Sequence, residues 1–397
     1  MVMLAQHGYG KSDKIERGLS AGHIQGVILS PRDEAPGNLA SYVYRLRQEY
    51  PQSTVFVDPQ FYASTVVNPK LGKLGEYAYF QSELTYRDFV APAAVSAMVS
   101  SVMNHQRSLA STHICAPTIA FDVFGDRWCS VALSMAGAAI HDHQQSGDGR
   151  PLLISFVISE QACRNAVQLD DFLDIVTDLE CDGFYFIVRR EVADYNQEMR
   201  SEAVSGLMYL SYILGDLNGY QVYHGYSDYI SLPLHAAGST GTACGWQFGL
   251  RRFTWGRYEQ STGGRQPRPR YSSLGLLNSI MINPDLEQIA RVGLLPQVLT
   301  GTNYDRAMAS RPLSSVAWPN DISALHHWHA LSKGVKHLET MPVGAQRLDE
   351  LARLLRTAVG VYQRISQTGA ILAAASGNTH ILQWKDGVED FRRRAKV

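Results

Sequence analysis

The amino-acid sequence predicts an α/β protein built as a (β/α)8 TIM barrel with a helical C-terminal extension. Three observations support this prediction. Short β-type runs recur along the chain, helical patterns separate them, and most of the runs are continuously apolar, as strands covered on both faces are. The seven candidate strands are residues 24–30, 54–58, 117–122, 152–159, 183–188, 220–226 and 242–249.

Helical segments lie between these runs. Residues 38–50, 166–180 and 197–217 repeat apolar positions at intervals of three and four, as amphipathic helices do. The eighth strand is expected after a Gly, Pro and Arg loop at 260–273, where LGLLNSIMI fits a strand or a helix. From Asp321 onward the chain is predicted to be helical, over 321–339 and 345–369.

We therefore expect a barrel domain over residues 1–285, with the closed barrel running from about residue 22 to about residue 285. A helical extension over 286–397 is expected to pack on it.

The composition of the chain argues against a membrane protein, a secreted protein and a protein held together by disulfides. The 397 residues are 45% hydrophobic and contain no apolar run of membrane-spanning length or secretory-signal type, so a cytoplasmic protein without a membrane partner is expected. The five cysteines include no C-x-x-C pair, which argues against a disulfide framework and a compact zinc site. No metal and no cofactor are expected.

The stretch AQHGYGKS, residues 5–12, fits the phosphate-binding pattern G-x-x-x-x-G-K-[ST] if Ala5 replaces the first glycine. A working phosphate loop follows a central strand, and the few residues Met1 to Leu4 predict a poor one. We favour a turn that leads into a helix over 12–22, with Ser12 or Asp13 as its N-cap.

In a (β/α)8 enzyme the reacting groups lie at the C-terminal ends of the strands. Asp58 and Asp122 end adjacent predicted strands, where they could share a pocket and shift each other's pKa for general acid–base or nucleophilic work. The alternative is that each caps a helix or holds a loop arginine. Other polar residues at predicted strand ends are Ser30, Arg32, Asp33, Ser159, Glu160, Arg189, Arg190, Glu191, His224, Asp228, Gln247, Arg251 and Arg252.

The formal net charge of −1 predicts no general attraction to nucleic acid, so such binding would need a local patch. One candidate patch is Arg251, Arg252, Arg257, Arg265, Arg268 and Arg270, interleaved with Phe253, Trp255 and Tyr258. These arginines are predicted to hold phosphates, the alternative being a solvated loop. The histidine-rich run 326-HHWH-329 could indicate a metal site, but we favour a role on a helix surface or in packing for these histidines.

The order of these segments resembles the tRNA-guanine transglycosylases, (β/α)8 enzymes that exchange guanine or 7-deazaguanine in nucleic acid. The segment 55-VFVDPQFYAS-64 is similar to the family's strand with DSGGFQ, and 118-TIAFDVF-124 to its MAFDE segment. The resemblance implies that Asp58 recognises the base and that Asp122 also contacts it. Two further stretches, 153–188 and 220–253, follow the family's order, and the helix from 326 looks like the one after its zinc loop.

This sequence differs from the family's motifs at the positions of the family's base-binding, nucleophilic and zinc-binding residues. Ser159-Glu160-Gln161 replaces Gln-Gly-Gly, Ala243-Cys244-Gly245-Trp246 stands where the nucleophilic aspartate is expected, and 301–315 replaces the C-x-C-x-x-C zinc loop. Without that aspartate, the usual covalent intermediate cannot form at this position. Additional base or substrate contacts are predicted for Phe61, Glu160, His224, Asp228 and Gln247.

The function predicted is that of a divergent transglycosylase-like protein that acts on or recognises a purine or 7-deazapurine base in DNA or RNA. The alternative is a catalytically inactive barrel that serves as a nucleic-acid- or protein-binding component of a larger system. A glycosidase with paired carboxylates is a more distant possibility. Protein partners and self-association are left open.

Overall fold

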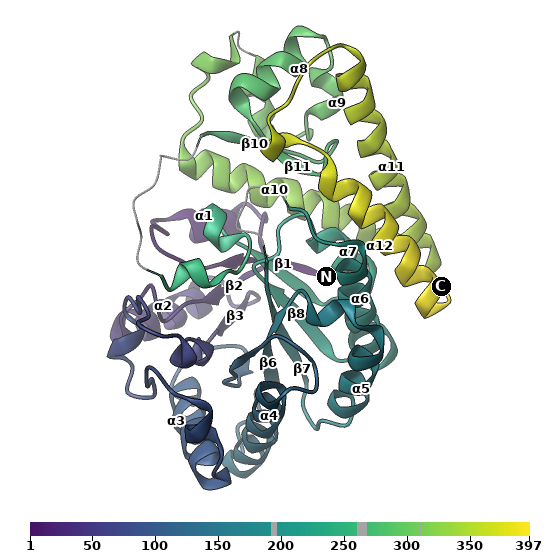
Figure 1. Ribbon diagram of the computed structural model, residues 1–397. Coiled ribbons are helices and arrows are strands. Elements are labelled where there is room, and N and C mark those ends of the chain that lie inside the picture. Colours follow the sequence, from purple (N-terminus) through teal and green to yellow (C-terminus); the bar gives the residue numbers. More distant parts are fainter. Residues whose placement is uncertain (192–196, 260–267, 310–311) are drawn as a thin grey trace.

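Parallel strands form a barrel at the centre of the molecule (Figure 1). The computed structural model describes residues 1–191, 197–259, 268–309 and 312–397. The strands are β1 (Val2–Gln6), β2 (Gly26–Leu29), β3 (Thr54–Val57), β4 (Ile114–Cys115), β5 (Ala120–Phe121), β6 (Leu152–Ser159), β7 (Gly183–Arg189), β8 (Gln221–Gly225) and β9 (Gly241–Cys244). Their order is β3-β2-β1-β9-β8-β7-β6-β4, and β5 also pairs with β6, so β4 and β5 share one of eight barrel positions.

The barrel closes between β3 and the segment that enters β4. The backbone N–H of Thr112 donates to the carbonyl of Val55 at 2.7 Å, and the N–H of Val55 donates to the Thr112 hydroxyl at 2.9 Å. These bonds satisfy backbone groups that an open sheet edge would leave exposed. The predicted α/β barrel is confirmed.

Helices surround the strands, as the apolar periodicity predicted. They are α1 (Lys14–Ser20), α2 (Pro36–Glu49), α3 (Pro92–Arg107), α4 (Arg127–Ser146), α5 (Ala166–Val176), α6 (Ser201–Ser211) and α7 (Ser231–Ala236). Local chemistry sets several helix starts: Pro36 and Pro92 occupy first turns, and the side chains of Asp126 and Asn165 accept backbone N–H groups as N-caps.

Each of the seven candidate runs overlaps a strand of the barrel, but the expected position of the eighth strand is wrong. It is β1, which pairs with β2 on one side and β9 on the other, so the barrel begins well before residue 22. Five residues suffice because both neighbours supply hydrogen bonds and Met3 to Gln6 are buried. The LGLLNSIMI segment instead provides β11 (Asn278–Met281), which pairs with β10 (Arg270–Ser273) in a separate antiparallel hairpin.

The hairpin belongs to an insertion between the last barrel strand and the last barrel helix. It is followed by α8 (Glu287–Arg291) and α9 (Leu295–Val298), and then by α10 (Asn320–Glu339), which packs against β1, α1 and α7. Figure 1 shows α10 running between the barrel and the hairpin. The helices α11 (Ala345–Gln367) and α12 (Thr379–Ala395) complete the predicted helical C-terminal part, and α12 packs on α6. The exact division at residue 285 stays a prediction.

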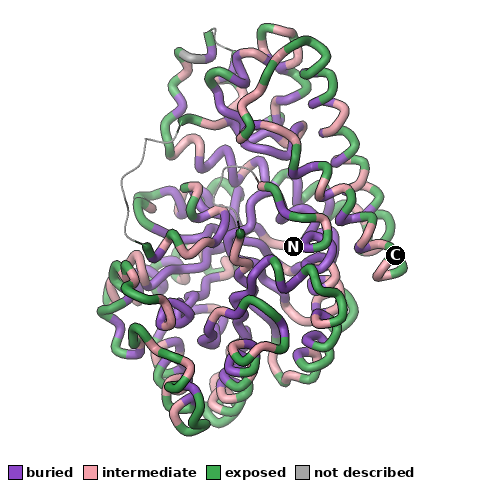
Figure 2. The backbone as a smooth tube through the Cα atoms, viewed as in Figure 1, coloured by how far each residue is buried: buried purple, intermediate pink, exposed green. Residues whose placement is uncertain are grey.

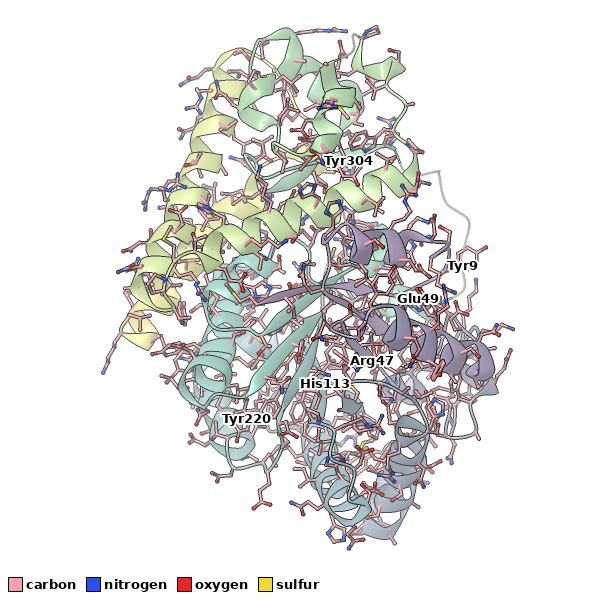
Figure 3. The ribbon with its side chains drawn as sticks, turned by 180° about the vertical axis from the view of Figure 1, so that it is seen from behind. Tyr9, Arg47, Glu49, His113, Tyr220 and Tyr304 are labelled. Atoms are coloured by element: carbon pink, nitrogen blue, oxygen red, sulfur yellow. The ribbon has the colours of Figure 1, made fainter. Side chains whose placement is uncertain are left out.

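Large side chains fill the barrel interior, and the buried parts of the backbone follow the strands (Figure 2). The ring of Phe56 contacts Tyr185, Tyr223 and His113 edge-on, with centroids 5.4 to 5.8 Å apart. His113, labelled in Figure 3, directly precedes β4. Within the described ranges, no helix is both long and apolar enough to span a bilayer.

We expect Gly206→Ala to destabilise the fold by about 1–3 kcal/mol, because overpacking costs that much. A Cβ at Gly206 in α6 would lie 1.9 Å from the carbonyl oxygen of Cys163. The control is Gly137→Ala in α4, where nothing lies within 4 Å of the added carbon. That change should stabilise the protein by roughly 0.5–1 kcal/mol through helix propensity. Urea denaturation measures both, and equal effects would contradict the packing described.

Candidate functional site at the C-terminal mouth of the barrel

Asp58 is the buried acid at the C-terminal mouth. It directly follows β3 and is only 1% exposed. One carboxyl oxygen, Oδ1, accepts the backbone N–H of Gln60 at 3.0 Å, and Oδ2 accepts the hydroxyl of Tyr62 at 2.9 Å. Gln60 has a left-handed backbone (φ 54°), which turns the chain so that these donors face the carboxyl.

The surroundings of Asp58 raise its pKa to about 7. Burial is the main cause, because the charged form loses its hydration. The Gln60 N–H, the Tyr62 hydroxyl and the positive charge of Arg257 oppose the rise. Near neutral pH both protonation states are therefore populated, so this carboxyl can accept or donate a hydrogen bond.

Polar and aromatic groups surround this acid. Tyr62, Tyr185, Tyr226 and Tyr258 are buried and electrostatically coupled to it. Two buried polar atoms of the region have no hydrogen-bond partner among the described residues: Gln60 Nε2 and Arg257 Nε. Such groups are normally satisfied in proteins, so a polar molecule bound here would gain hydrogen bonds from them.

The segment after β9 covers the mouth with aromatic side chains. Phe253 contacts Tyr62, Tyr226 and Trp255 with ring centroids 5.3 to 5.4 Å apart. Arg257 fixes this segment to the loop after β2 through an ion pair with Asp33. The cover thus brings the Arg257 guanidinium near enough to act on the charge of Asp58, and it packs Phe253 against Tyr62, which donates to Asp58.

A cavity of about 250 Å³ lies over the ends of β1, β2 and β9. Its walls are Tyr9, Arg32, Asp33, Gln247, Gly249, Leu250, Thr254, Gly256 and Arg257. Arg257 lines this cavity and also interacts with the charge of Asp58. Arg257 is therefore the residue that links this cavity to the buried acid.

Asp122 has a different environment from Asp58. Its side chain is 64% exposed and pairs with Arg189. Phe121, the preceding residue, packs against Phe156 and against Phe172 of α5, on the helical side of the strands. Because side chains alternate along a strand, Asp122 points away from this helical side, but its exposure and its pairing with Arg189 keep it out of the buried surroundings of Asp58.

The other predicted base contacts are dispersed. Phe61 is fully buried, and Glu160 is buried in an ion pair with Arg190. His224 lies toward the helical layer, where its Nε2 is 2.9 Å from the Ser211 hydroxyl and burial lowers its pKa to about 3. Gln247 lines the 250 Å³ cavity, whereas Asp228 belongs to a separate buried cluster.

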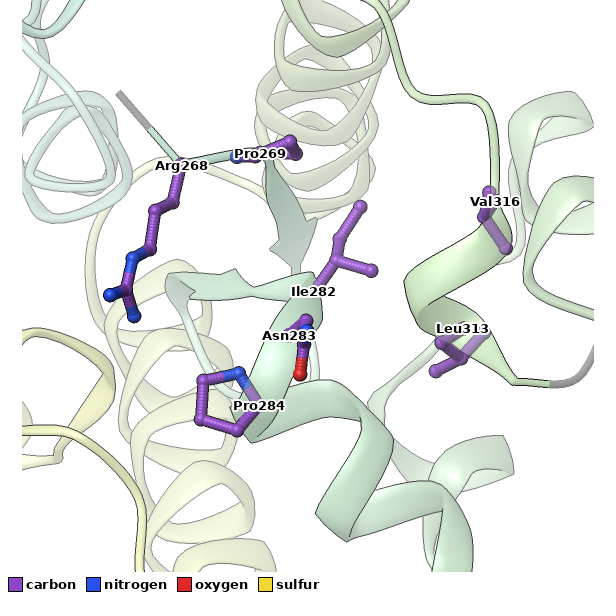
Figure 4. A pocket seen from close by; sticks show the side chains of 7 residues that line it. All are labelled: Arg268, Pro269, Ile282, Asn283, Pro284, Leu313 and Val316. Carbon is purple, nitrogen blue, oxygen red and sulfur yellow. The ribbon is translucent and has the colours of Figure 1, made fainter. Parts of the chain in front are cut away.

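The arginines predicted to bind phosphate do not form one patch. Arg252 is buried over the ring of Phe248, and Arg257 is held by Asp33. Arg251 donates to the Gly245 carbonyl, and Arg270 to the carbonyls of Ser279 and Ala375. Arg268 lines a cavity of about 510 Å³ beside the β10–β11 hairpin (Figure 4). Arg265 lies outside the described residues.

The AQHGYGKS motif at residues 5–12 does follow a central strand, β1. The prediction that Met1 to Leu4 would form a poor strand, which was used against a phosphate loop, is therefore wrong. The predicted turn into a helix is confirmed, because α1 begins at Lys14 after Asp13. The Asp13 side chain makes no capping bond. The lysine of the motif, Lys11, pairs with Glu34, and Lys14 donates to the Gly10 carbonyl.

Two histidines of α10, His326 and His329, pack against other residues of the protein. His326 contacts the Ser272 carbonyl at 3.0 Å, and His329 stacks on His23 with centroids 4.2 Å apart. Tyr304, which is labelled in Figure 3, packs beside both histidines. These contacts agree with a packing role for His326 and His329.

Sequence reasoning missed the groups that surround Asp58. Tyr62 was detectable, because it lies four residues beyond Asp58 and could reach the same strand end. The sequence gave no indication that Tyr185, inside β7, and Tyr226, after β8, lie near Asp58. They reach it only because the strands close into a barrel.

Fold and site together define an α/β-barrel protein with a buried acid under an aromatic cover at the C-terminal ends of its strands. No family model matches the chain, and no curated protein matches it. Among solved structures, it is similar to a glycosyl hydrolase of the GH3 family from Mycobacterium smegmatis str. MC2 155. That match has 12% identity and a TM-score of 0.40, and covers 83% of this chain and 94% of the other. Similarity at this level carries no functional argument.

Proposed function

We propose that this protein recognises or acts on a purine or 7-deazapurine base in nucleic acid, and that Asp58 contacts the base. The observation that carries the proposal is a fully buried carboxyl at the end of a barrel strand, with a pKa of about 7, beneath aromatic rings. Barrel enzymes place their reacting groups at this end.

A planar heterocycle suits the groups around Asp58. Its edge carries several hydrogen-bond donors and acceptors, and its faces stack on aromatic rings. Asp58 can offer either a carboxylate or a carboxylic acid, and Gln60 Nε2 is a buried donor with no partner among the described residues. Phe253 and Tyr62 supply aromatic surface beside the same carboxyl.

The structure limits the chemistry that can be proposed. Burial raises the pKa of Cys244 well above its usual range, so this thiol is a poor nucleophile where the resembling enzymes use an aspartate. Asp122 pairs with Arg189 in solvent. We therefore propose Asp58 as a base-recognising or proton-transferring group, without a covalent intermediate at either position.

A second candidate function is base recognition without catalysis, within a larger system. The exposed position of Asp122 favours it, because Asp122 pairs with Arg189 in solvent while Asp58 is buried with Tyr62, so the paired carboxylates expected for catalysis are not assembled. Both candidates require the same base contact at Asp58. They differ only in whether the nucleic acid is chemically changed.

Mass spectrometry of nucleosides distinguishes the two candidates. DNA and RNA would be compared from cells that lack the gene and from cells that express the native protein, Asp58→Asn or Asp122→Asn. Catalysis predicts an altered nucleoside with the native protein and Asp122→Asn, and its loss with Asp58→Asn. Identical profiles in all cells would eliminate the catalytic candidate and leave recognition.

Salt dependence tests the nucleic-acid partner itself. We expect oligonucleotide affinity, followed by fluorescence anisotropy, to fall steeply with salt because phosphate contacts release counterions. Arg268→Ala should flatten the slope by about one phosphate contact. Lys385→Ala, an exposed cation paired with Glu389 on α12, is the matched control and should change nothing. Asp58→Asn should keep the slope and lose base preference. Affinity that does not respond to salt would argue for a free base as the ligand.

A further inference from the structure

Three metal-ligating side chains meet in the interior at the ends of β8 and β9. Asp228 follows β8, Cys244 is the last residue of β9, and His327 comes from α10. Their ligand atoms all lie within 4.8 Å of one another, and all three residues are buried. We propose that this cluster, named here the β8–β9 triad, binds one zinc ion.

Two distances within the triad are those of ligands that share an ion. His327 Nε2 is 3.2 Å from Cys244 Sγ and 3.2 Å from Asp228 Oδ1. Ligands placed tetrahedrally around zinc, at about 2.0–2.3 Å from it, are separated by distances of this size. The third pair, Cys244 and Asp228, has its ligand atoms within 4.8 Å and would close on the ion.

The triad is not explained by hydrogen bonding alone. A single ring N–H at His327 Nε2 can serve either Asp228 Oδ1 or Cys244 Sγ, but not both. A carboxylate oxygen in that position is costly unless a cation or donor meets it. A shared zinc ion would satisfy all three atoms together.

The second ring nitrogen of His327 is already held. Its Nδ1 lies 2.7 Å from the Ser272 hydroxyl. Histidines that bind metal commonly donate their other N–H to a neighbouring acceptor, which fixes the ring and its tautomer. With the proton on Nδ1 donated to Ser272, Nε2 presents its lone pair to the triad.

The ligand set selects zinc among the common cations. One sulfur, one imidazole nitrogen and one carboxylate oxygen match zinc, whereas magnesium and calcium prefer oxygen alone. A Cys244 thiolate and an Asp228 carboxylate would balance the charge of a divalent ion. Arg251, the nearby cation, donates to the Gly245 carbonyl and the Ser279 hydroxyl, and its charge also acts on Asp228.

Three protein ligands leave a fourth position for water. A small cavity of about 10 Å³, lined by Asp228, Arg251 and Gln197 among others, adjoins the triad. That volume is close to the space needed by one water molecule. The expectation of no zinc rested on the wide spacing of cysteines in the sequence, but the fold assembles this site from positions as far apart as Cys244 and His327, 83 residues.

Metal analysis of the purified full chain tests the site without reference to base binding. After equilibration with zinc and dialysis, we expect one zinc ion per chain by elemental mass spectrometry. Cobalt loading should give tetrahedral d–d bands and a thiolate-to-cobalt charge-transfer band. Chain without stoichiometric zinc, or a cobalt spectrum without the thiolate band, would overturn the proposal.

Substitutions locate the ion. Cys244→Ser and His327→Gln should weaken zinc binding on the order of 100-fold or more. Cys163→Ser and His326→Gln remove a buried thiol and a buried imidazole outside the triad, so they should bind zinc as the native chain does. Equal binding by Cys244→Ser and Cys163→Ser would place any bound zinc elsewhere and overturn the assignment. If Cys244→Ser does not fold, the cobalt spectrum of the native chain still decides whether a thiolate is a ligand.

Discussion

Asp58→Asn should make the protein more stable than the native chain above pH 7 and leave stability almost unchanged below pH 4. The folded-state pKa of Asp58 is about 7, against 3.8 for an ordinary aspartate. Between these pH values the folded protein keeps a proton that the unfolded chain has released. The free energy of unfolding therefore falls as pH rises through this window, by up to roughly 1.4 kcal/mol per pH unit.

Asparagine has no proton to lose, so the difference between the two chains should grow from pH 4 to pH 7 and then level off. Urea denaturation at a series of pH values measures it. Asp122→Asn is the matched control, because that carboxylate is largely exposed and should give no such pH-dependent gain. Parallel stability curves for the native chain and Asp58→Asn would show that the acid is not desolvated as the structure indicates.

Trp328→Ala should cost about 3–5 kcal/mol, the usual loss for deleting a buried aromatic side chain. Trp328 is fully buried on α10, and its Nε1 donates to the Cys244 carbonyl at 2.7 Å. Its ring packs edge-on against Trp246 and close to Gly18, where an added Cβ would lie 3.0 Å from it. This side chain therefore joins α10 to β9 and α1.

The matched control is Trp128→Ala on α4. That ring is partly exposed and contacts Tyr86 and Phe89, on the segment that leads into α3. We expect a loss of only about 1–2 kcal/mol there, because less apolar surface leaves water. Comparable losses for the two variants, measured by urea denaturation, would contradict the role of α10 as the last helix of the barrel.

The pattern of apolar runs was sufficient to predict the barrel, because strands buried on both faces are recognisable individually. It missed β1, whose five residues resemble an ordinary short apolar segment until β2 and β9 pair with them. The same pattern could not decide whether LGLLNSIMI is a strand or a helix, and this segment contains β11 of the hairpin. An apolar run in the sequence was therefore enough to identify most strands. It could not show that β1 completes the barrel, because that depends on pairing with β2 and β9.

The candidate site was predictable only in part, for the same physical reason. Asp58 was found because a polar residue at the end of an apolar run identifies a strand end. Whether such a residue is buried depends on how the neighbouring loops and strand ends pack around it, and Asp122 is exposed beside Arg189. The neighbours of Asp58 come from β7, β8 and the segment after β9, so only the closed barrel brings them together.

The position of β1 between β2 and β9 also has a consequence for synthesis. Its residue Met3 meets Thr242, 239 residues later, so most of the chain must leave the ribosome before the strand acquires its second neighbour. Until then β1 presents an unpaired apolar edge, and so does β8 on the other side of the gap that β9 will fill. Unpaired edges of this kind are templates for association with other chains. During production of the protein, aggregation should therefore begin at these two strands, and chaperones that shield extended apolar segments should raise its yield.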